Sequence, residues 1–205
     1  MRQTTHDELS PQIIAQARRG DANAFGQLVQ RYQSPVYNLA YRLLGDAAEA
    51  EDAAQETFLR AYQQLRAFDA ERRFTPWLLS IATHYCIDRL RRRKFVGPSL
   101  DADDLRDQFT ATTPEPEAAT LAREDAEQAQ QLLNHLSPPS RAVVVLKYWN
   151  DLSLDEIATV TGDSVGAVKV KLHRARQAMA KASQDLRGFP KPHRSETQGA
   201  TSHAR

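Results

Sequence analysis

The feature that most constrains the fold is a short helix, a turn and a second helix within LSLDEIATVTGDSVGAVKVKLHRARQAM, residues 152–179. Ser153–Glu156 has the pattern of an N-terminal capping box, and Ser164 can cap the helix that follows. Gly162 lies between the two helices, where a positive φ angle is expected. Ile157 and Val168 can share a core across the turn. This order and spacing predict a helix-turn-helix.

The second helix of this motif has a buried and an exposed face when its residues are placed at 100° intervals. Val168 and Leu172 belong to the apolar stripe. The exposed face begins with small residues, which lets a helix lie deep in a major groove, and it carries cations that can reach bases or phosphates. The alternative is a solvated basic helix. The candidate DNA-binding residues are Ser164, Gly166, Ala167, Lys169, Val170, Lys171, His173, Arg174 and Arg176.

A second unusual segment is TPWLLSIATHYCIDRLRRRK, residues 75–94, a mostly apolar helix that ends in four cations. Thr75 followed by Pro76 predicts its start. A helix this apolar packs inside a bundle, and only a narrow polar stripe remains. Cations neutralise phosphates, and aromatic and polar groups can receive an unstacked base. The candidate nucleic-acid residues are Trp77, Ser80, His84, Asp88, Arg91, Arg92, Arg93 and Lys94.

Each of these candidates also has an ordinary structural interpretation. Trp77 can be a core aromatic, and His84 can be a surface histidine or one with its hydrogen bonds satisfied. The cations can be a solvated helix end, where positive charge is favoured by the helix dipole. The sequence leaves both interpretations open.

An acidic face is predicted on the helix that runs from Asp46 to about Leu65. A capping-box pattern at Asp46–Glu49 begins this helix. We expect its core face to be formed by Ala47, Ala54, Phe58 and Leu65. The other side carries Asp52, Gln55, Glu56, Leu59 and Arg60. Such a surface is either solvated or a docking site for a basic partner helix.

The chain as a whole has helix signals and no strand pattern, so an all-α fold of two small helical domains is expected. Pro35 is expected to kink or interrupt a helix. The predicted domains are residues 10–96 and 117–187. Residues 97–116 are predicted to be a flexible linker, because residues 99–126 hold eight acidic and two basic residues. A disordered tail is expected over residues 188–205.

Composition excludes several classes of protein. The chain has 205 residues, of which 41% are hydrophobic and 26% charged. Its single cysteine, Cys86, cannot form an internal disulfide and fits a reducing cytoplasm. Neither a signal peptide nor a membrane-spanning run is expected. Without a convincing nucleophile–base set or metal-ligand spacing, we expect no enzyme activity, no cofactor and no metal.

Four segments together resemble the extracytoplasmic-function (ECF) group of bacterial sigma factors in the sigma-70 family. They are EDAAQETFLRAYQQLRAF, FTPWLLSIATHYCIDRLRRRK, LSPPSRAVVVLKYWNDLSLDEIA and SVGAVKVKLHRAR, and they occur in this order within residues 10–187. The resemblance implies a cytoplasmic factor that directs promoter-specific transcription initiation. It also implies three partners: bacterial core RNA polymerase, promoter DNA and an anti-sigma factor. Membrane insertion is not expected.

The resemblance also implies a role for each segment. Residues 10–96 look like region 2, and the helix with Asp52, Gln55, Glu56, Leu59 and Arg60 is similar to the one that docks on the β′ clamp helices. The helix Trp77–Lys94 looks like the element that melts and reads the −10 region. The helix-turn-helix looks like region 4, which reads the −35 element. The acidic linker resembles the segment threaded near the RNA exit path.

Some residues depart from the family pattern, which often has other residue types at these positions: His84, Thr161, Asp163, Ala167 and Val170. The promoter sequence is therefore left open. Two other functions also remain. A free-standing helix-turn-helix regulator would not need a polar stripe leading into four cations. A helical protein-binding module would not need small exposed residues on its last helix.

Overall fold

The computed structural model describes residues 10–96 and 117–188, and all regular structure in these ranges is helical. The elements are α1 (Pro11–Arg18), α2 (Ala22–Leu44), α3 (Ala47–Gln64), the 3₁₀ turn η1 (Leu65–Ala67), α4 (Phe74–Val96), α5 (Glu117–Asn134), α6 (Pro138–Tyr148), α7 (Leu154–Thr161) and α8 (Val165–Gly188). The all-α prediction is confirmed. The predicted linker, 97–116, and residues 189–205 of the predicted tail lie outside the described residues.

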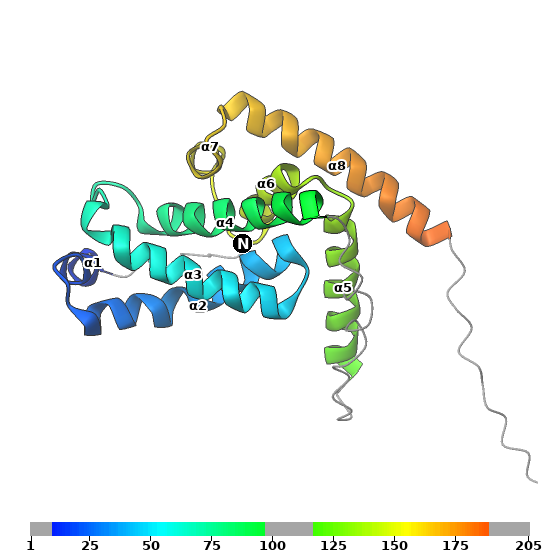
Figure 1. Ribbon diagram of the computed structural model, residues 1–205. Coiled ribbons are helices and arrows are strands. Elements are labelled where there is room, and N and C mark those ends of the chain that lie inside the picture. Colours follow the sequence, from blue (N-terminus) through cyan, green and yellow to red (C-terminus); the bar gives the residue numbers. More distant parts are fainter. Residues whose placement is uncertain (1–9, 97–116, 189–205) are drawn as a thin grey trace, which may run out of the picture.

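The first four helices form one bundle, and α6 and α7 lie against α4 (Figure 1). The α5 and α8 helices extend away from this body (Figure 1). In the bundle, Leu28, Leu39 and Leu43 of α2 pack with Leu78 and Leu79 of α4, and all five side chains are almost completely buried. This core fixes the direction in which α3 and α4 present their remaining faces.

The ends of α2 lie where the local sequence signals predict them, but the predicted break in its middle is absent. The Asp21 carboxylate accepts hydrogen bonds from the backbone N–H groups of Asn23 and Ala24, and Gly45 ends the helix with φ 79°. The prediction that a helix restarts at Pro35 is wrong, because α2 is continuous through it, whereas a kink there stays a prediction. Burial of the apolar face of this long helix outweighs the loss of one backbone donor.

The start of α4 also differs from the prediction. The helix begins at Phe74, and Thr75 lies inside it, buried, with its hydroxyl donating to the Tyr32 hydroxyl oxygen at 3.3 Å. Phe74 is 1% exposed, and its ring lies 5.2 Å from that of Tyr32 and 5.6 Å from that of Phe68. This aromatic packing favours helical geometry two residues earlier than Pro76, the first helical residue that the Thr-Pro signal indicated.

The core face of α3 is one step away from the predicted face. Ala47 is exposed, and Ala54 and Phe58 are only half-buried, whereas Leu65 is buried as expected. The buried residues within the helix are Ala50, Ala53, Thr57 and Ala61. These small side chains let α3 approach α2 and α4 closely, and the Thr57 hydroxyl is satisfied by donating to the Ala53 carbonyl at 2.6 Å. The prediction gave too much weight to large apolar residues.

The C-terminal helices contact the bundle through charged side chains. Arg141 of α6 is 8% exposed, and its Nη1 donates to the carbonyl oxygen of Leu43, at the end of α2, at 2.5 Å. The guanidinium of Arg42 lies 4.4 Å from the centre of the Trp149 ring. Both contacts use the C-terminal end of α2, where cations are favoured. They join the two halves of the described chain.

In the described ranges, no helix combines the length and apolar character that crossing a membrane requires.

Candidate nucleic-acid and protein interfaces

The helix-turn-helix is built by the local signals that predicted it. Glu156 and Ser153 form a complete capping box: the Ser153 N–H donates to Glu156 Oε2 at 2.8 Å, and the Glu156 N–H donates to Ser153 Oγ at 3.2 Å. Gly162 ends α7 with φ 71°, and the Ala167 N–H donates to Ser164 Oγ at 3.2 Å. Ile157, Val168 and Leu172 are buried beneath the turn. The orientation of α8 is therefore set by caps, glycine and core together.

The outer face of α8 has the character that the sequence predicted. Ser164, Gly166 and Lys169 are exposed, and Ala167 is half-buried. Val170 is 48% exposed, although it is apolar. His173, Arg174 and Arg176 continue this exposed face along the helix. In solution such a face gains nothing from an exposed valine, whereas in a major groove Val170 could pack against a thymine methyl group.

The cations of α8 are of two kinds. Lys171 is held by Asp163, whose two oxygens lie 2.8 and 2.6 Å from Nζ. Arg176 donates from Nε to the Tyr148 hydroxyl at 2.7 Å. Within the described part of the chain, Lys169 and Arg174 make neither an ion pair nor a side-chain hydrogen bond, and neither does His173.

The sequence did not indicate that Asp163 and Tyr148 hold cations of α8. Asp163 precedes α8 by two residues, and Tyr148 ends α6, so neither shares a helical face with the cation that it holds. Partial burial acts to raise the pKa of Asp163, but hydrogen bonds from Lys171 and Thr161 and the charge of Lys171 lower it overall. Helical periodicity within one segment could not have found these pairs.

The predicted stripe on α4 divides into a covered and an exposed part. Trp77 is half-buried, with its ring 4.8 Å from Phe68 and 5.3 Å from Phe74, so the core interpretation of this residue is partly right. Ser80 is half-buried and donates to the Trp77 carbonyl at 2.7 Å. His84 and Asp88 are exposed.

Trp77 and Ser80 line a cavity of about 490 Å³ between α4 and α7. Its other residues are Arg72, Arg73, Pro76, Asp155, Glu156 and Thr159. Arg73, just before α4, forms an ion pair with Glu156 of α7 across this space. The N-terminal part of the predicted nucleic-acid stripe on α4 is therefore partly covered by α7, the first helix of the helix-turn-helix.

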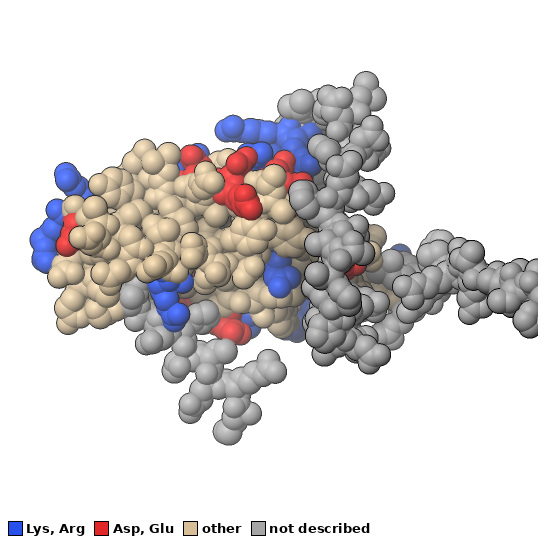
Figure 2. All heavy atoms as spheres, turned by 90° about the horizontal axis from the view of Figure 1, so that it is seen from below, with Lys and Arg blue, Asp and Glu red and all other residues tan. Residues whose placement is uncertain are grey.

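The basic end of α4 meets the acidic face of α3. Glu49 pairs with Arg89 at 3.6 Å and with Arg93 at 3.3 Å, and Asp52 lies 3.7 Å from Arg89. The space-filling view shows acidic side chains gathered beside a group of cations (Figure 2). A hydrogen bond to Tyr85 and the nearby carboxylates raise the pKa of Arg89. Arg89 was not among the predicted site residues, because it falls outside the polar stripe.

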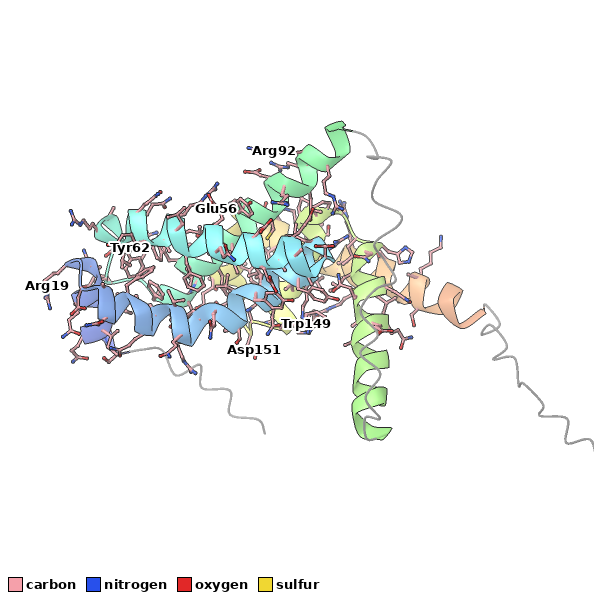
Figure 3. The ribbon with its side chains drawn as sticks, turned by 60° about the horizontal axis from the view of Figure 1, so that its bottom comes forward. Arg19, Glu56, Tyr62, Arg92, Trp149 and Asp151 are labelled. Atoms are coloured by element: carbon pink, nitrogen blue, oxygen red, sulfur yellow. The ribbon has the colours of Figure 1, made fainter. Side chains whose placement is uncertain are left out.

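The remaining cations of α4 are less tightly held. Arg91 lies 3.6 Å from the Asp88 carboxylate. Arg92 extends outward near the end of α4 (Figure 3). It makes no ion pair with any described residue. Lys94 belongs to α4, but its side chain lies outside the described residues. Only Arg92 of the three described cations in this run is thus unpaired.

The predicted docking residues lie on one outer surface of α3. Glu56 and Arg60 form an ion pair at 2.6 Å, and Figure 3 shows Glu56 on the outer side of the helix. Leu59 is 53% exposed, and Gln55 and Asp52 are exposed. Beside them a groove of about 690 Å³ runs between α2 and α3, with Gln33, Tyr37, Glu51, Gln55 and Phe58 in its lining. The contribution of α2 was missed, although Gln33 and Tyr37 are one helical turn apart.

Comparisons with known proteins agree with this arrangement. The Sigma-70 region 2 family matches residues 28–96, and the Sigma-70 region 4 family matches residues 126–179. The ECF RNA polymerase sigma factor SigW of Bacillus subtilis is 41% identical over 180 residues, which cover 84% of this chain and 96% of SigW. The RNA polymerase sigma-H factor of Pseudomonas aeruginosa is 35% identical, over 87% of this chain and 96% of its own.

Solved structures show the same fold. CnrH in complex with the cytosolic domain of CnrY matches with a TM-score of 0.65 and 28% identity, over 85% of this chain and 97% of CnrH. The sigma factor RpoE of Bartonella quintana, solved with the anti-sigma factor NepR, matches with a TM-score of 0.61 and 22% identity, over 78% of this chain and 96% of RpoE.

A helix-turn-helix and a basic helix end beside an acidic helix face, in described ranges whose regular structure is all helical, are features expected of a DNA-binding transcription factor. The matches make the class specific: the chain belongs to the ECF group of the sigma-70 family of RNA polymerase sigma factors. It is a transcription initiation factor and not an enzyme. A free-standing regulator is not favoured, because region 2 accounts for the N-terminal bundle.

Proposed function

We propose that this sigma factor recognises promoters at two separate points while it is bound to core RNA polymerase. In this proposal α8 reads the −35 element, α4 binds the opened −10 element, and α3 docks on the β′ clamp helices. Each contact with DNA is weak alone, and the polymerase joins them by raising their effective concentration. The observation that carries the proposal is the exposed face of α8, where small residues and unpaired cations occur together.

The −35 assignment rests on the chemistry of α8. Gly166 and Ala167 allow close approach to the groove floor, and Lys169 and Arg174 are available for phosphates or base edges. The other proposed contacts are Ser164, Val170, His173 and Arg176. Lys171 lies beside them but is held by the Asp163 carboxylate, so it is not counted among the contacts. Arginine makes the commonest specific contact, a bidentate hydrogen-bond pair with guanine. The exposed side chain of Arg174 makes it the strongest candidate for such a contact.

The −10 assignment rests on Trp77 and the cavity beside it. An unstacked base can lie on an aromatic ring or enter a small polar pocket, which offsets part of the cost of opening the duplex. The carboxylates of Asp155 and Glu156 face the same space and would repel the DNA backbone. The proposal therefore requires α7 to separate from α4 when the factor is mounted on polymerase. Further −10 contacts are assigned to Ser80, His84, Asp88, Arg91, Arg92, Arg93 and Lys94.

The docking assignment rests on the outer surface of α3. Leu59 supplies exposed apolar area, and Asp52, Gln55, Glu56 and Arg60 surround it with polar groups, as is usual at a protein interface. The neighbouring α2–α3 groove extends this surface. A factor that docks on bacterial RNA polymerase acts in the cytoplasm, and we propose this location for the protein. An anti-sigma factor is proposed as a further partner, because the sigma factor RpoE was solved with the anti-sigma factor NepR, and CnrH was solved with the cytosolic domain of CnrY.

The proposal is tested by run-off transcription with purified core polymerase on a genomic library. The wild-type chain is expected to direct initiation at a limited set of promoters. Reversing the charge at both Asp52 and Glu56 should weaken association with core polymerase without unfolding the chain. The matched control reverses two charges on exposed side chains outside α3, Glu71→Lys and Glu127→Lys. Failure of the wild-type chain to direct any initiation would contradict the proposal, and unchanged association of the reversed variant would remove α3 from the docking site.

A further inference from the structure

Two cations of the recognition helix are held by other side chains, and the two holders differ in charge. Asp163 holds Lys171 through both carboxylate oxygens, at 2.8 and 2.6 Å. Tyr148 holds Arg176 through a neutral hydroxyl at 2.7 Å, with the guanidinium 5.8 Å from the ring centre. The phenol orients a cation and leaves its charge intact. The carboxylate cancels the charge that it holds.

The Asp163–Lys171 pair joins the turn of the helix-turn-helix to α8. Asp163 follows Gly162 and directly precedes the capping residue Ser164, and Lys171 lies two helical turns further along. The side chains are only 22% and 30% exposed, so solvent screens this pair less than an ordinary surface pair. Lys169, two residues before Lys171, is exposed and has no such partner among the described residues.

Moving Lys171 to a DNA phosphate would have two costs. The ammonium group would give up two charge-assisted hydrogen bonds. The bare carboxylate of Asp163 would then remain beside the start of α8, where a phosphate would otherwise be attracted by the helix dipole. The new phosphate contact is offset by both losses, whereas Lys169 can bind a phosphate without breaking any bond.

We infer that Asp163 is a positioning residue that withholds Lys171 from the DNA backbone, so that α8 meets the −35 element with fewer active cations than its sequence carries. This inference rests on the proposed role of α8 in promoter binding. It makes Asp163 a determinant of affinity and of salt dependence without any contact of its own with DNA. It also gives a physical reason for an acidic residue in the turn of a DNA-binding motif.

Independent action of the two residues is the competing account. In that case Asp163 simply repels DNA, Lys171 simply attracts it, and the effects of removing them add. If Asp163 withholds Lys171, removal of the lysine changes promoter affinity and its salt dependence little while Asp163 is present. The same removal changes both much more when Asp163 is absent. A double-mutant cycle separates the two accounts.

The experiment measures how the affinity of the holoenzyme for a promoter duplex falls with KCl concentration. It uses the full chain with core polymerase and a promoter found by run-off transcription. The chains are wild type, Asp163→Asn, Lys171→Gln and the double variant, with Asp163→Ala as a second replacement. Lys169→Gln, with and without Asp163→Asn, is the control, because it removes the same charge from an unpaired position.

With Asp163 present, Lys171→Gln should leave the slope of log K against log salt nearly unchanged. In the Asp163→Asn background, the same change should reduce the slope by about 0.9, the loss of one phosphate contact. Lys169→Gln should reduce it by about 0.9 in both backgrounds. Equal effects of Lys171→Gln in both backgrounds would overturn the inference and leave the proposed function intact. A wild-type holoenzyme that binds no promoter would overturn both.

Discussion

The two helices assigned to DNA, α8 and α4, present their binding groups in different ways. On α8, Lys169, His173 and Arg174 are exposed and unpaired within the described chain. On α4, Trp77 and Ser80 face a cavity whose far wall is α7, and Arg93 is paired with Glu49. One of the two proposed DNA-binding surfaces is open in this structure, and the other is partly covered.

This difference indicates a division of work between the helices. An open face can attract duplex DNA at once, because its phosphate contacts require no rearrangement. A covered face can act only after α7 has moved, which couples −10 binding to an event elsewhere in the complex. A ligand or partner can drive such a change only as far as it binds the open state better than the closed one. Docking on polymerase is the event that we propose.

The largest effect is expected from Arg174→Ala, which tests the open surface. Loss of a bidentate contact to a base should weaken binding to the −35 element by about 1–3 kcal/mol and relax the preference at one base pair. Gln177→Ala, three residues further along the exposed face, is the control. Quantitative footprinting of the holoenzyme over the −35 region measures the effect. Equal footprints for wild type and Arg174→Ala would exclude this arginine as a base contact.

A smaller effect is expected from Arg73→Glu, which tests the covered surface. The change removes the ion pair with Glu156 and places two carboxylates at the mouth of the α4–α7 cavity. Exposed pairs contribute about 0.2–1 kcal/mol, so separation of α7 from α4 should become up to about fivefold more favourable.

Energy transfer between dyes on α4 and α8 of the free chain measures this separation. Arg66→Glu is the matched control, because it makes the same charge change at an exposed arginine that does not line the cavity. If the two variants gave the same transfer efficiency, the Arg73–Glu156 pair would have no special part in closing the cavity.

The third prediction compares cations within α4. Arg92 is unpaired among the described residues, whereas Arg93 is held by Glu49. Arg92→Ala should therefore reduce the salt slope of promoter binding by about 0.9, as one lost phosphate contact does. Arg93→Ala should reduce it less. The salt dependence of open-complex formation measures both, and a larger change for Arg93→Ala would show that the pair with Glu49 does not persist on DNA.

The smallest effect on the α4–α7 contact is expected when the pH is lowered. Partial burial acts to raise the pKa of Glu156, but hydrogen bonds with Ser153 and the charge of Arg73 lower it overall. A lowered folded-state pKa gives stability that is present above the ordinary carboxyl pKa and is lost as pH falls through the lowered value. The α4–α7 contact should thus loosen only as the pH falls below the ordinary carboxyl pKa and through the lowered pKa of Glu156.

Energy transfer between the same two dyes, followed from neutral pH downward, measures this loss. Glu156→Gln should remove most of the dependence, because it cannot change charge. A transition that persists unchanged in Glu156→Gln would assign the acid sensitivity to another group.

The sequence predicted the local parts of this structure better than the long-range ones. The capping box at Ser153, the positive φ of Gly162 and the buried Val168 follow from short-range rules, and all three are confirmed. The core face of α3 was misplaced, because close helix packing through Ala50 and Ala53 produces no strong hydrophobic pattern.

The side-chain pairs of the candidate sites were not predictable in this way. Arg73 and Glu156 are 83 residues apart, and Arg93 and Glu49 are 44 apart. Asp163 and Lys171 are eight residues apart, but Asp163 lies in the turn before α8 and Lys171 lies within α8. Helical periodicity describes one element at a time, so partners on different elements stay hidden until the elements are placed in space.

The measurement that tests the central claim most directly is a footprint of promoter DNA with and without core polymerase. The free chain should give at most weak protection at the −35 element and none at the −10 element. The holoenzyme should protect both elements, and thymines of the −10 region should become reactive to permanganate as the strands open. Protection of the −10 element by the free chain at the same concentration, or a holoenzyme that never opens it, would contradict two-point recognition dependent on polymerase.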